Sequence, residues 1–212
     1  MATDSLPSGP SNAPKRSIAP LIWIIVLSMA PVVAAFLVYY IPEFRPAGSV
    51  NYGTLVEPQR PMPTAEQLPL TTLDGKPYDL NQLKGQWLLL AADGAACPEE
   101  CAKKLYILRN THAMTGKNVE RLNRVWFITD DAEVPEKVLE AYRGTIMLRV
   151  KPEDLARFLT VPTGMTSSQE ALAVHLWIMD PLGNLILEYG KDPDPFKVRK
   201  DIGRLLHNSR IG

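Results

Sequence analysis

The chain has 212 residues, of which 46% are hydrophobic and 22% are charged, a balance typical of a folded protein rather than a disordered one. The 23 basic and 23 acidic residues cancel, and the sequence contains no block of Lys and Arg. Because proteins that bind nucleic acid usually carry a basic surplus, nucleic acid is not expected as a partner. The two cysteines are too few for a multi-disulfide scaffold or a Cys-rich zinc site.

An uncharged, strongly apolar segment runs from Ile18 to Ile41. As a helix it would be about 36 Å long, which is enough to cross a hydrocarbon core of about 30 Å. It is also much longer than the apolar part of a cleaved signal peptide. We therefore expect residues 18–41 to form one N-terminal transmembrane helix that acts as an uncleaved signal anchor.

The charges beside this segment differ between its two ends. Two basic residues, Lys15 and Arg16, lie before it, and after it Glu43 and Arg45 cancel each other. By the positive-inside rule, residues 1–17 form a short cytoplasmic tail and the rest of the chain is exported. We expect a single-pass protein of the bacterial inner (cytoplasmic) membrane whose C-terminal domain lies in the periplasm.

The remainder of the chain divides at about residue 70. Residues 42–69 are rich in proline and poor in apolar runs, which predicts an extended, semi-stiff stalk. Residues 70–212 alternate strand-like and helix-like patterns. The predicted strands are Leu70–Leu73, Trp87–Ala92, Arg124–Thr129, Ile146–Val150, Val174–Met179 and Leu185–Tyr189. The predicted helices are Cys101–His112, Glu136–Arg143, Pro152–Leu159 and Phe196–Leu206. This order predicts an α/β thioredoxin-like sandwich, a central mixed sheet flanked by helices.

The only two cysteines, Cys97 and Cys101, lie between the apolar strand that ends at Ala92 and the helix that follows it. At this spacing on a helix, both sulfurs lie on one face, one turn apart. The helix N-terminus favours a Cys97 thiolate, whereas the carboxylates of Glu99 and Glu100 oppose it. Two thiolates so placed suit a soft metal such as Cu(I), and they also suit a reversible disulfide. A purely structural disulfide is a third interpretation, although a disulfide that closes so short a loop stabilises a fold little.

These features resemble the SCO/SenC family, membrane-anchored thioredoxin-fold factors that help to assemble the copper centre of cytochrome c oxidase. The resemblance covers about residues 68–206 and the anchor. It depends on five segments: Leu73-Asp74-Gly75-Lys76, Cys97-Pro98-x-x-Cys101, Val125–Thr129 with Asp130-Asp131, Pro135–Tyr142, and Asp180-Pro181-Leu182-Gly183. In that family both cysteines and a later histidine bind copper. The resemblance therefore implies copper ligation by Cys97, Cys101 and His175.

The chain departs from the family pattern in three places. Residues 92–96 replace the aromatic Gly-x-Thr run that precedes the first cysteine in the family. The segment after the next strand, residues 130–135 here, is shorter than the corresponding segment in the family. The family histidine precedes its strand, whereas His175 lies inside the predicted strand Val174–Met179, where an odd shift turns a side chain to the other face. His175 is therefore either a copper ligand or a hydrogen-bonded core residue. The reserve ligands are His112, Met114 and Met165.

Three functions are compatible with these residues. The first is copper transfer to a cytochrome c oxidase subunit, which makes the chain a membrane-anchored periplasmic assembly factor and a metallochaperone. The second is thiol–disulfide exchange that keeps a client's copper-binding cysteines reduced, which needs only Cys97 and Cys101 and makes the chain an oxidoreductase. The third is a non-catalytic assembly scaffold with a structural disulfide. The first is our principal expectation.

Overall fold

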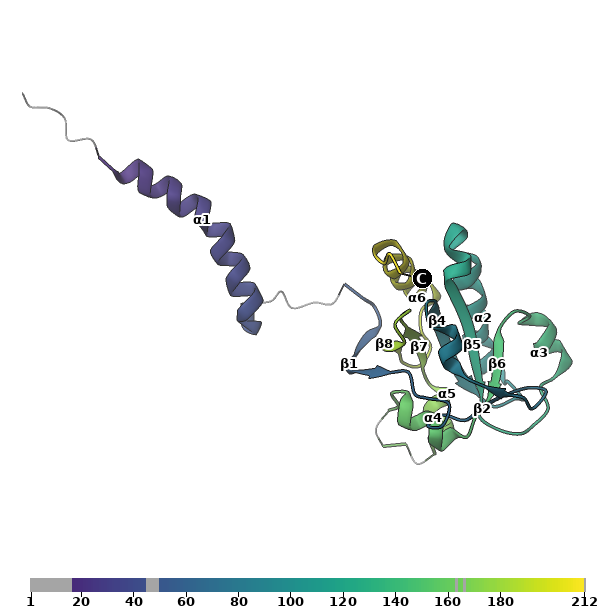
Figure 1. Cartoon of the computed structure of the whole chain (residues 1–212). Coiled ribbons are helices and arrows are strands. Elements are labelled where there is room, and N and C mark those ends of the chain that lie inside the picture. The colour runs from purple at the N-terminus through teal and green to yellow at the C-terminus, as the bar shows by residue number, and fades with distance from the viewer. Residues whose placement is uncertain (1–16, 45–49, 163, 166, 212) are drawn as a thin grey trace, which may run out of the picture. The chain divides into compact units, whose positions relative to one another are not determined.

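The computed structural model describes residues 17–44, 50–162, 164, 165 and 167–211, and divides into two units, Met1–Ser49 and Val50–Gly212 (Figure 1). In the first unit, α1 spans Ala19–Tyr40, is followed by a short 3₁₀ turn, and buries none of its side chains. It is long and apolar enough to cross a membrane, so it is a candidate transmembrane helix. The tail predicted at residues 1–17 lies, except for its last residue, outside the described residues.

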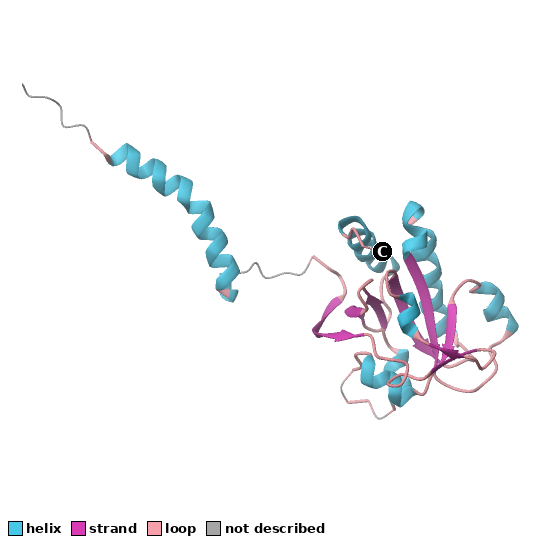
Figure 2. Cartoon of the chain, viewed as in Figure 1, coloured by secondary structure: helices cyan, strands magenta, loops and turns pink. Residues whose placement is uncertain are grey.

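The second unit is built on one eight-stranded mixed sheet, flanked by helices (Figures 1 and 2). The strands are β1 (Thr54–Pro61), β2 (Leu70–Thr72), β3 (Pro77–Tyr78), β4 (Trp87–Asp93), β5 (Leu122–Ile128), β6 (Ile146–Arg149), β7 (Leu176–Met179) and β8 (Asn184–Tyr189). The helices are α2 (Glu99–Ala113), α3 (Glu136–Ala141), α4 (Pro152–Phe158), α5 (Ser168–Ala173) and α6 (Pro195–Asn208). The spatial order of the strands in the sheet is β1-β8-β7-β4-β5-β6-β2-β3.

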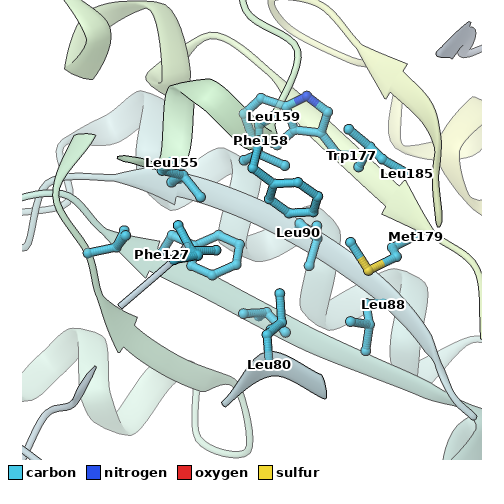
Figure 3. Close-up of a cluster of buried hydrophobic side chains, with 14 of the residues drawn as sticks. Leu80, Leu88, Leu90, Phe127, Leu155, Phe158, Leu159, Trp177, Met179 and Leu185 are labelled. Carbon is cyan, nitrogen blue, oxygen red and sulfur yellow. The ribbon is translucent and has the colours of Figure 1, made fainter. Parts of the chain in front are cut away.

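Strand β4 lies in the middle of the sheet, parallel to β5 and antiparallel to β7. Its side chains alternate between two hydrophobic clusters, because successive residues of a strand point to opposite faces. Leu88 and Leu90 join the first cluster, with Phe158 of α4 and Trp177 of β7 (Figure 3). Leu89 and its odd-numbered neighbours join the second cluster, with side chains of α2 and α6. Burial on both faces explains why this strand is apolar throughout, and the layered mixed sheet confirms the predicted fold class.

The prediction that residues 42–69 form a stalk is wrong for its second half. Strand β1 (Thr54–Pro61) pairs antiparallel with β8 and extends the sheet by one strand. Its prolines hid the strand in the sequence, but an edge strand with an irregular register tolerates proline because one side of its backbone needs no partner. The Arg60 guanidinium also donates hydrogen bonds to the carbonyls of Phe158 and Leu159, which ties β1 to the end of α4.

Two element boundaries near the cysteines also differ from the predictions. Helix α2 begins at Glu99, two residues before the predicted start at Cys101, and Cys97 precedes the helix. The short helix α5, which the sequence analysis missed, occupies residues before β7, and that strand begins at Leu176 rather than Val174. Both hydrophobic clusters lie wholly within Val50–Gly212, so this unit carries a complete core of its own.

The position of β1 predicts where the chain can be truncated. A fragment that begins at Leu70 should lose about 5 kcal/mol in its free energy of unfolding relative to one that begins at Val50. The reason is that it lacks three buried side chains, each contributing about 1.5–3 kcal/mol: Val56, Met62 and Leu68. Urea unfolding of the two fragments measures the difference. Equal stabilities of the two fragments would contradict a structural role for residues 54–61 and would support the predicted stalk.

Candidate functional site

A disulfide joins Cys97 and Cys101 at the point where the chain leaves β4 and enters α2, with 5.0 Å between the two Cα atoms. Cys101 lies in the first turn of α2 and is 1% exposed, whereas Cys97 lies outside the helix and is 9% exposed. The two sulfurs therefore do not share a helical face as the spacing had suggested. The arrangement is asymmetric, and Cys97 is the cysteine that a reaction partner reaches more easily.

The backbone at Cys97 has a left-handed conformation, with φ at +43°. A residue with a side chain is less stable in this region by roughly 1–2 kcal/mol, so the surrounding structure must hold it there. The Cys97 N–H donates to the carbonyl of Gly94, and the Ala95 N–H donates to the carboxylate of Asp130 at the end of β5. A side chain at Gly94 would come within 2.5 Å of that carboxylate, so the close approach requires glycine.

A buried ion pair lies beneath this loop. Lys104 of α2 is 5% exposed, and its ammonium group lies 2.8 Å from the carboxylate of Asp93, the last residue of β4. It also donates to the carbonyls of Ala92 and Ala173 at 2.8 and 2.6 Å. Burial lowers the pKa of Lys104, and the nearby Asp93 carboxylate opposes that shift. Lys104 thus fastens α2 to the ends of β4 and α5.

The roles of Lys104, Asp93 and Asp130 were not predicted from the sequence. A lysine on an amphipathic helix normally lies on the solvent-exposed side, and nothing local distinguishes Lys104 from Lys103. The available signal was the position of the two aspartates, each at the carboxyl end of a buried strand, because β4 and β5 are parallel and their ends meet at one edge.

His175 lies between α5 and β7, and its side chain is 13% exposed. Its Nδ1 atom lies 3.9 Å from a carboxylate oxygen of Glu188, and its ring centre lies 5.9 Å from that of Trp177. Trp177 belongs to the first hydrophobic cluster, whereas Cys97 and Cys101 belong to the second, on the other face of the sheet. The nearest ring and the nearest carboxylate of His175 therefore lie on the face opposite the cysteines, although Lys104 of α2 is also near enough to lower its pKa.

Within the part of the chain that the structure describes, no three or more His, Cys, Asp or Glu side chains form a group that could hold a metal ion. The structure thus brings Cys97 and Cys101 together but does not add His175 to them. Two of the reserve ligands, His112 and Met114, lie at the far end of α2, about 16 Å or more along the axis from Cys101. The third, Met165, lines a groove of about 850 Å³ beside the first turns of α2.

Residues 87–209, more than half of the chain, match the family described as "Transmembrane-like, thioredoxin-like, C-terminal domain". The chain belongs to this family. No curated protein matches it. The family match covers the sheet from β4 onward, α6, and residues 94–98 between β4 and α2, which we call the cysteine loop. The site described above therefore lies in the part of the chain that matches the family.

Solved structures with the same fold include two SCO proteins. Arabidopsis thaliana ScoI with copper bound is 22% identical, with a TM-score of 0.54, over 66% of this chain and 96% of that one. Yeast Sco1 with copper bound is 15% identical, with a TM-score of 0.53, over 75% of this chain and 90% of that one. At these identities the likeness shows the fold, and in the fold it confirms the resemblance predicted from the motifs.

The pKa of His175 predicts a pH-dependent contribution to stability. Burial lowers this pKa below the ordinary value of 6.5, although Glu188 opposes the shift. The unfolded chain therefore binds the proton first, so the contribution is complete above about pH 6.5 and is lost as the pH falls through the folded-state value. We expect His175→Ala to lower the free energy of unfolding at pH 7 by about 1–3 kcal/mol, because a largely buried side chain packed beside Trp177 is lost, and to reduce its slope below pH 6.5.

Thermal and urea unfolding between pH 5 and 8 test this, with His207→Ala as the control because His207 is exposed on α6. The dithiol reduction potential and Cu(I) affinity are measured on the same proteins, and both should be unchanged in His175→Ala. Weakened Cu(I) binding at unchanged stability would instead identify His175 as a ligand.

Proposed function

We propose that the protein is a membrane-anchored assembly factor that delivers copper to the copper centre of cytochrome c oxidase. The observation that supports this most is the paired Cys97 and Cys101 at the strand–helix junction of a thioredoxin-like fold. ScoI and Sco1, which share this fold, have been solved with copper bound. Copper is the cargo here, and an oxidase subunit, or the cysteines of its copper site, is the recipient.

The donor set fits Cu(I) once the disulfide is reduced. Reduction takes two electrons and two protons and yields two thiols, and loss of their protons gives two soft thiolates that match Cu(I). Cys97, at the more exposed position, is the sulfur that meets the recipient, and Cys101 holds the ion from the buried side. The family resemblance implies His175 as a third ligand, whereas its contacts favour a structural role, and the stability and affinity measurements above decide between the two.

The disulfide itself favours a second candidate, thiol–disulfide exchange with a client. In this reaction the Cys97 thiolate attacks a client disulfide and forms a mixed disulfide, releasing one client thiol. Cys101 then attacks Cys97, the second client thiol leaves, and the two electrons lost by the dithiol are gained by the client. The chain ends as the Cys97–Cys101 disulfide, so a dithiol reductant must regenerate it before another turnover.

The membrane anchor belongs to the same proposal. Helix α1 is apolar along its full length, and Lys15 and Arg16 precede it. We infer that α1 anchors the chain in the bacterial inner membrane with its N-terminus in the cytoplasm. The unit Val50–Gly212 then lies in the periplasm, where a disulfide persists and where thiols must be kept reduced actively.

The cysteine pair can be tested as one unit. Cys97→Ala and Cys101→Ala should each abolish Cu(I) binding by the reduced Val50–Gly212 unit and its dithiol redox activity, and the double variant should be no worse. Each variant should stay folded, because the bridged cysteines are only four residues apart. So short a bridge lowers the entropy of the unfolded chain little and therefore stabilises the fold little. Anaerobic titration against a Cu(I) chelator and equilibration with glutathione are the measurements.

Met114→Leu is the matched control, since it removes a soft donor at the other end of α2 and should change neither result. In cells, both cysteine variants should lose oxidase assembly. If assembly were complete without either cysteine, the protein would be a scaffold and both chemical proposals would fail.

The orientation has a separate test. A reporter enzyme that is active only in the periplasm should be active when it is fused after Gly212, and a reporter that needs the cytoplasm should be inactive there. Exchanging Lys15 and Arg16 for glutamate should lower the fraction of chains in this orientation, because the basic residues retain the N-terminus inside. Activity of the cytoplasmic reporter alone in the unaltered chain would refute the periplasmic placement.

A further inference from the structure

Helix α6 carries its charge on one side only. Val198, Ile202 and Leu206 are buried in the second hydrophobic cluster, and the basic residues lie on the rest of the helix. These are Lys197, Arg199, Lys200 and Arg204, of which the first three are exposed. The one acidic residue in the α6 sequence, Asp201, is 0% exposed and points into the protein. Its carboxylate lies 3.8 Å from the Arg204 guanidinium and offsets that charge, so the exposed positive charge is that of Lys197, Arg199 and Lys200.

The chain enters the domain against this basic surface. The Asp201 carboxylate accepts hydrogen bonds from the N–H groups of Tyr52 and Gly53 at 2.8 and 2.9 Å, and from the Tyr189 hydroxyl. Lys200 donates to the Tyr52 hydroxyl at 3.1 Å, and the side chain of Arg204 donates to the carbonyl of Val50. The segment that arrives from α1 is thus fixed to α6 at its first described residues.

The covalent connection limits how far this surface can lie from the end of α1. Residues 41–49 join Tyr40 to Val50, and a fully extended chain of that length spans about 35 Å at most. Under the anchor proposed above, on which this inference depends, Val50, which is hydrogen-bonded to Arg204 of α6, stays within that distance of the end of α1. A short tether gives the head groups a high effective concentration at α6.

Two apolar groups beside these basic residues suit the interface between water and lipid. Phe196 of α6 is 71% exposed with Arg199 over its ring at 5.6 Å, and Met114, at the end of α2, is 61% exposed. Both line a hollow of about 930 Å³ together with Tyr52, the four basic residues and one acidic residue, Asp194. Lys and Arg beside exposed aromatic side chains are typical of surfaces that rest on a membrane.

We propose that the basic side of α6 binds the head groups of anionic phospholipids and holds the domain against the membrane that α1 enters. Complementary charge supplies the attraction, and the tether selects lipid over an acidic protein surface. The apolar face of α6 stays in the core, so the contact is electrostatic with Phe196 as the inserted group.

Vesicle sedimentation of the Val50–Gly212 unit tests this apart from α1. The unit should bind vesicles that contain phosphatidylglycerol, should not bind pure phosphatidylcholine vesicles, and should be released by salt. The double variant Lys197→Glu/Arg199→Glu should bind at least about 25-fold more weakly, about fivefold for each basic residue removed. The matched control Lys137→Glu/Lys151→Glu makes the same charge change on exposed residues outside α6 and should bind like the unaltered unit.

Equal loss in the control, or no binding by the unaltered unit, would overturn the proposal. In the full chain reconstituted into bilayers, amide exchange in α6 should be slower with phosphatidylglycerol than without it. The cysteine variants should bind vesicles normally, so lipid binding and cysteine chemistry can fail independently. Loss of the full chain from membranes on carbonate extraction would refute the anchor alone.

Discussion

The ion pair between Lys104 and Asp93 is the interaction on which the rest of the site depends. Burying two charges costs several kcal/mol, and the cost is offset only when their remaining hydrogen-bonding capacity is satisfied. Here the ammonium group also meets two carbonyls, and the second oxygen of the carboxylate accepts the N–H of Gly94. The pair thereby fixes the beginning of α2, the end of β4 and the first residue of the cysteine loop in one arrangement.

The difference between the two cysteines follows from this arrangement. Cys101 is carried by α2 against the core, whereas Cys97 must return from the end of β4 through a loop that Asp130 holds in place. The backbone at Cys97 is left-handed, which costs energy. Such strain is typical of functional sites, where it directs a side chain to a particular position. A fully buried sulfur and a second sulfur nearer the surface in one pair is the arrangement that both copper transfer and disulfide exchange need.

The sequence predicted the elements whose pattern is long and regular, and it missed those whose stability comes from contacts distant in the chain. The buried strands β4 and β5 and the helix α6 were found because their apolar residues repeat with the period of the element. Strand β1 was missed because its partner β8 lies far along the chain. Helix α5 was missed, whereas α3, which also has six residues, was predicted. The same limit applies to the site. The spacing of Cys97 and Cys101 could be read directly, but the burial of Lys104 depends on the ends of β4 and α5, and the surroundings of His175 depend on β8.

The two helices that carry the proposed functions share one core. Leu105 and Leu108 of α2 pack in the same cluster as Val198 and Ile202 of α6, so the two helices keep a fixed relation to each other. In the proposed arrangement, lipid contact at α6 therefore sets the direction in which α2 presents Cys97 relative to the bilayer. A tether alone leaves the domain free to rotate, whereas a second contact removes most of this rotational freedom beforehand. Each encounter with a client then costs less rotational entropy. For a recipient that is itself held in the membrane, this restriction raises the rate of productive contact without any change in the chemistry of the cysteines.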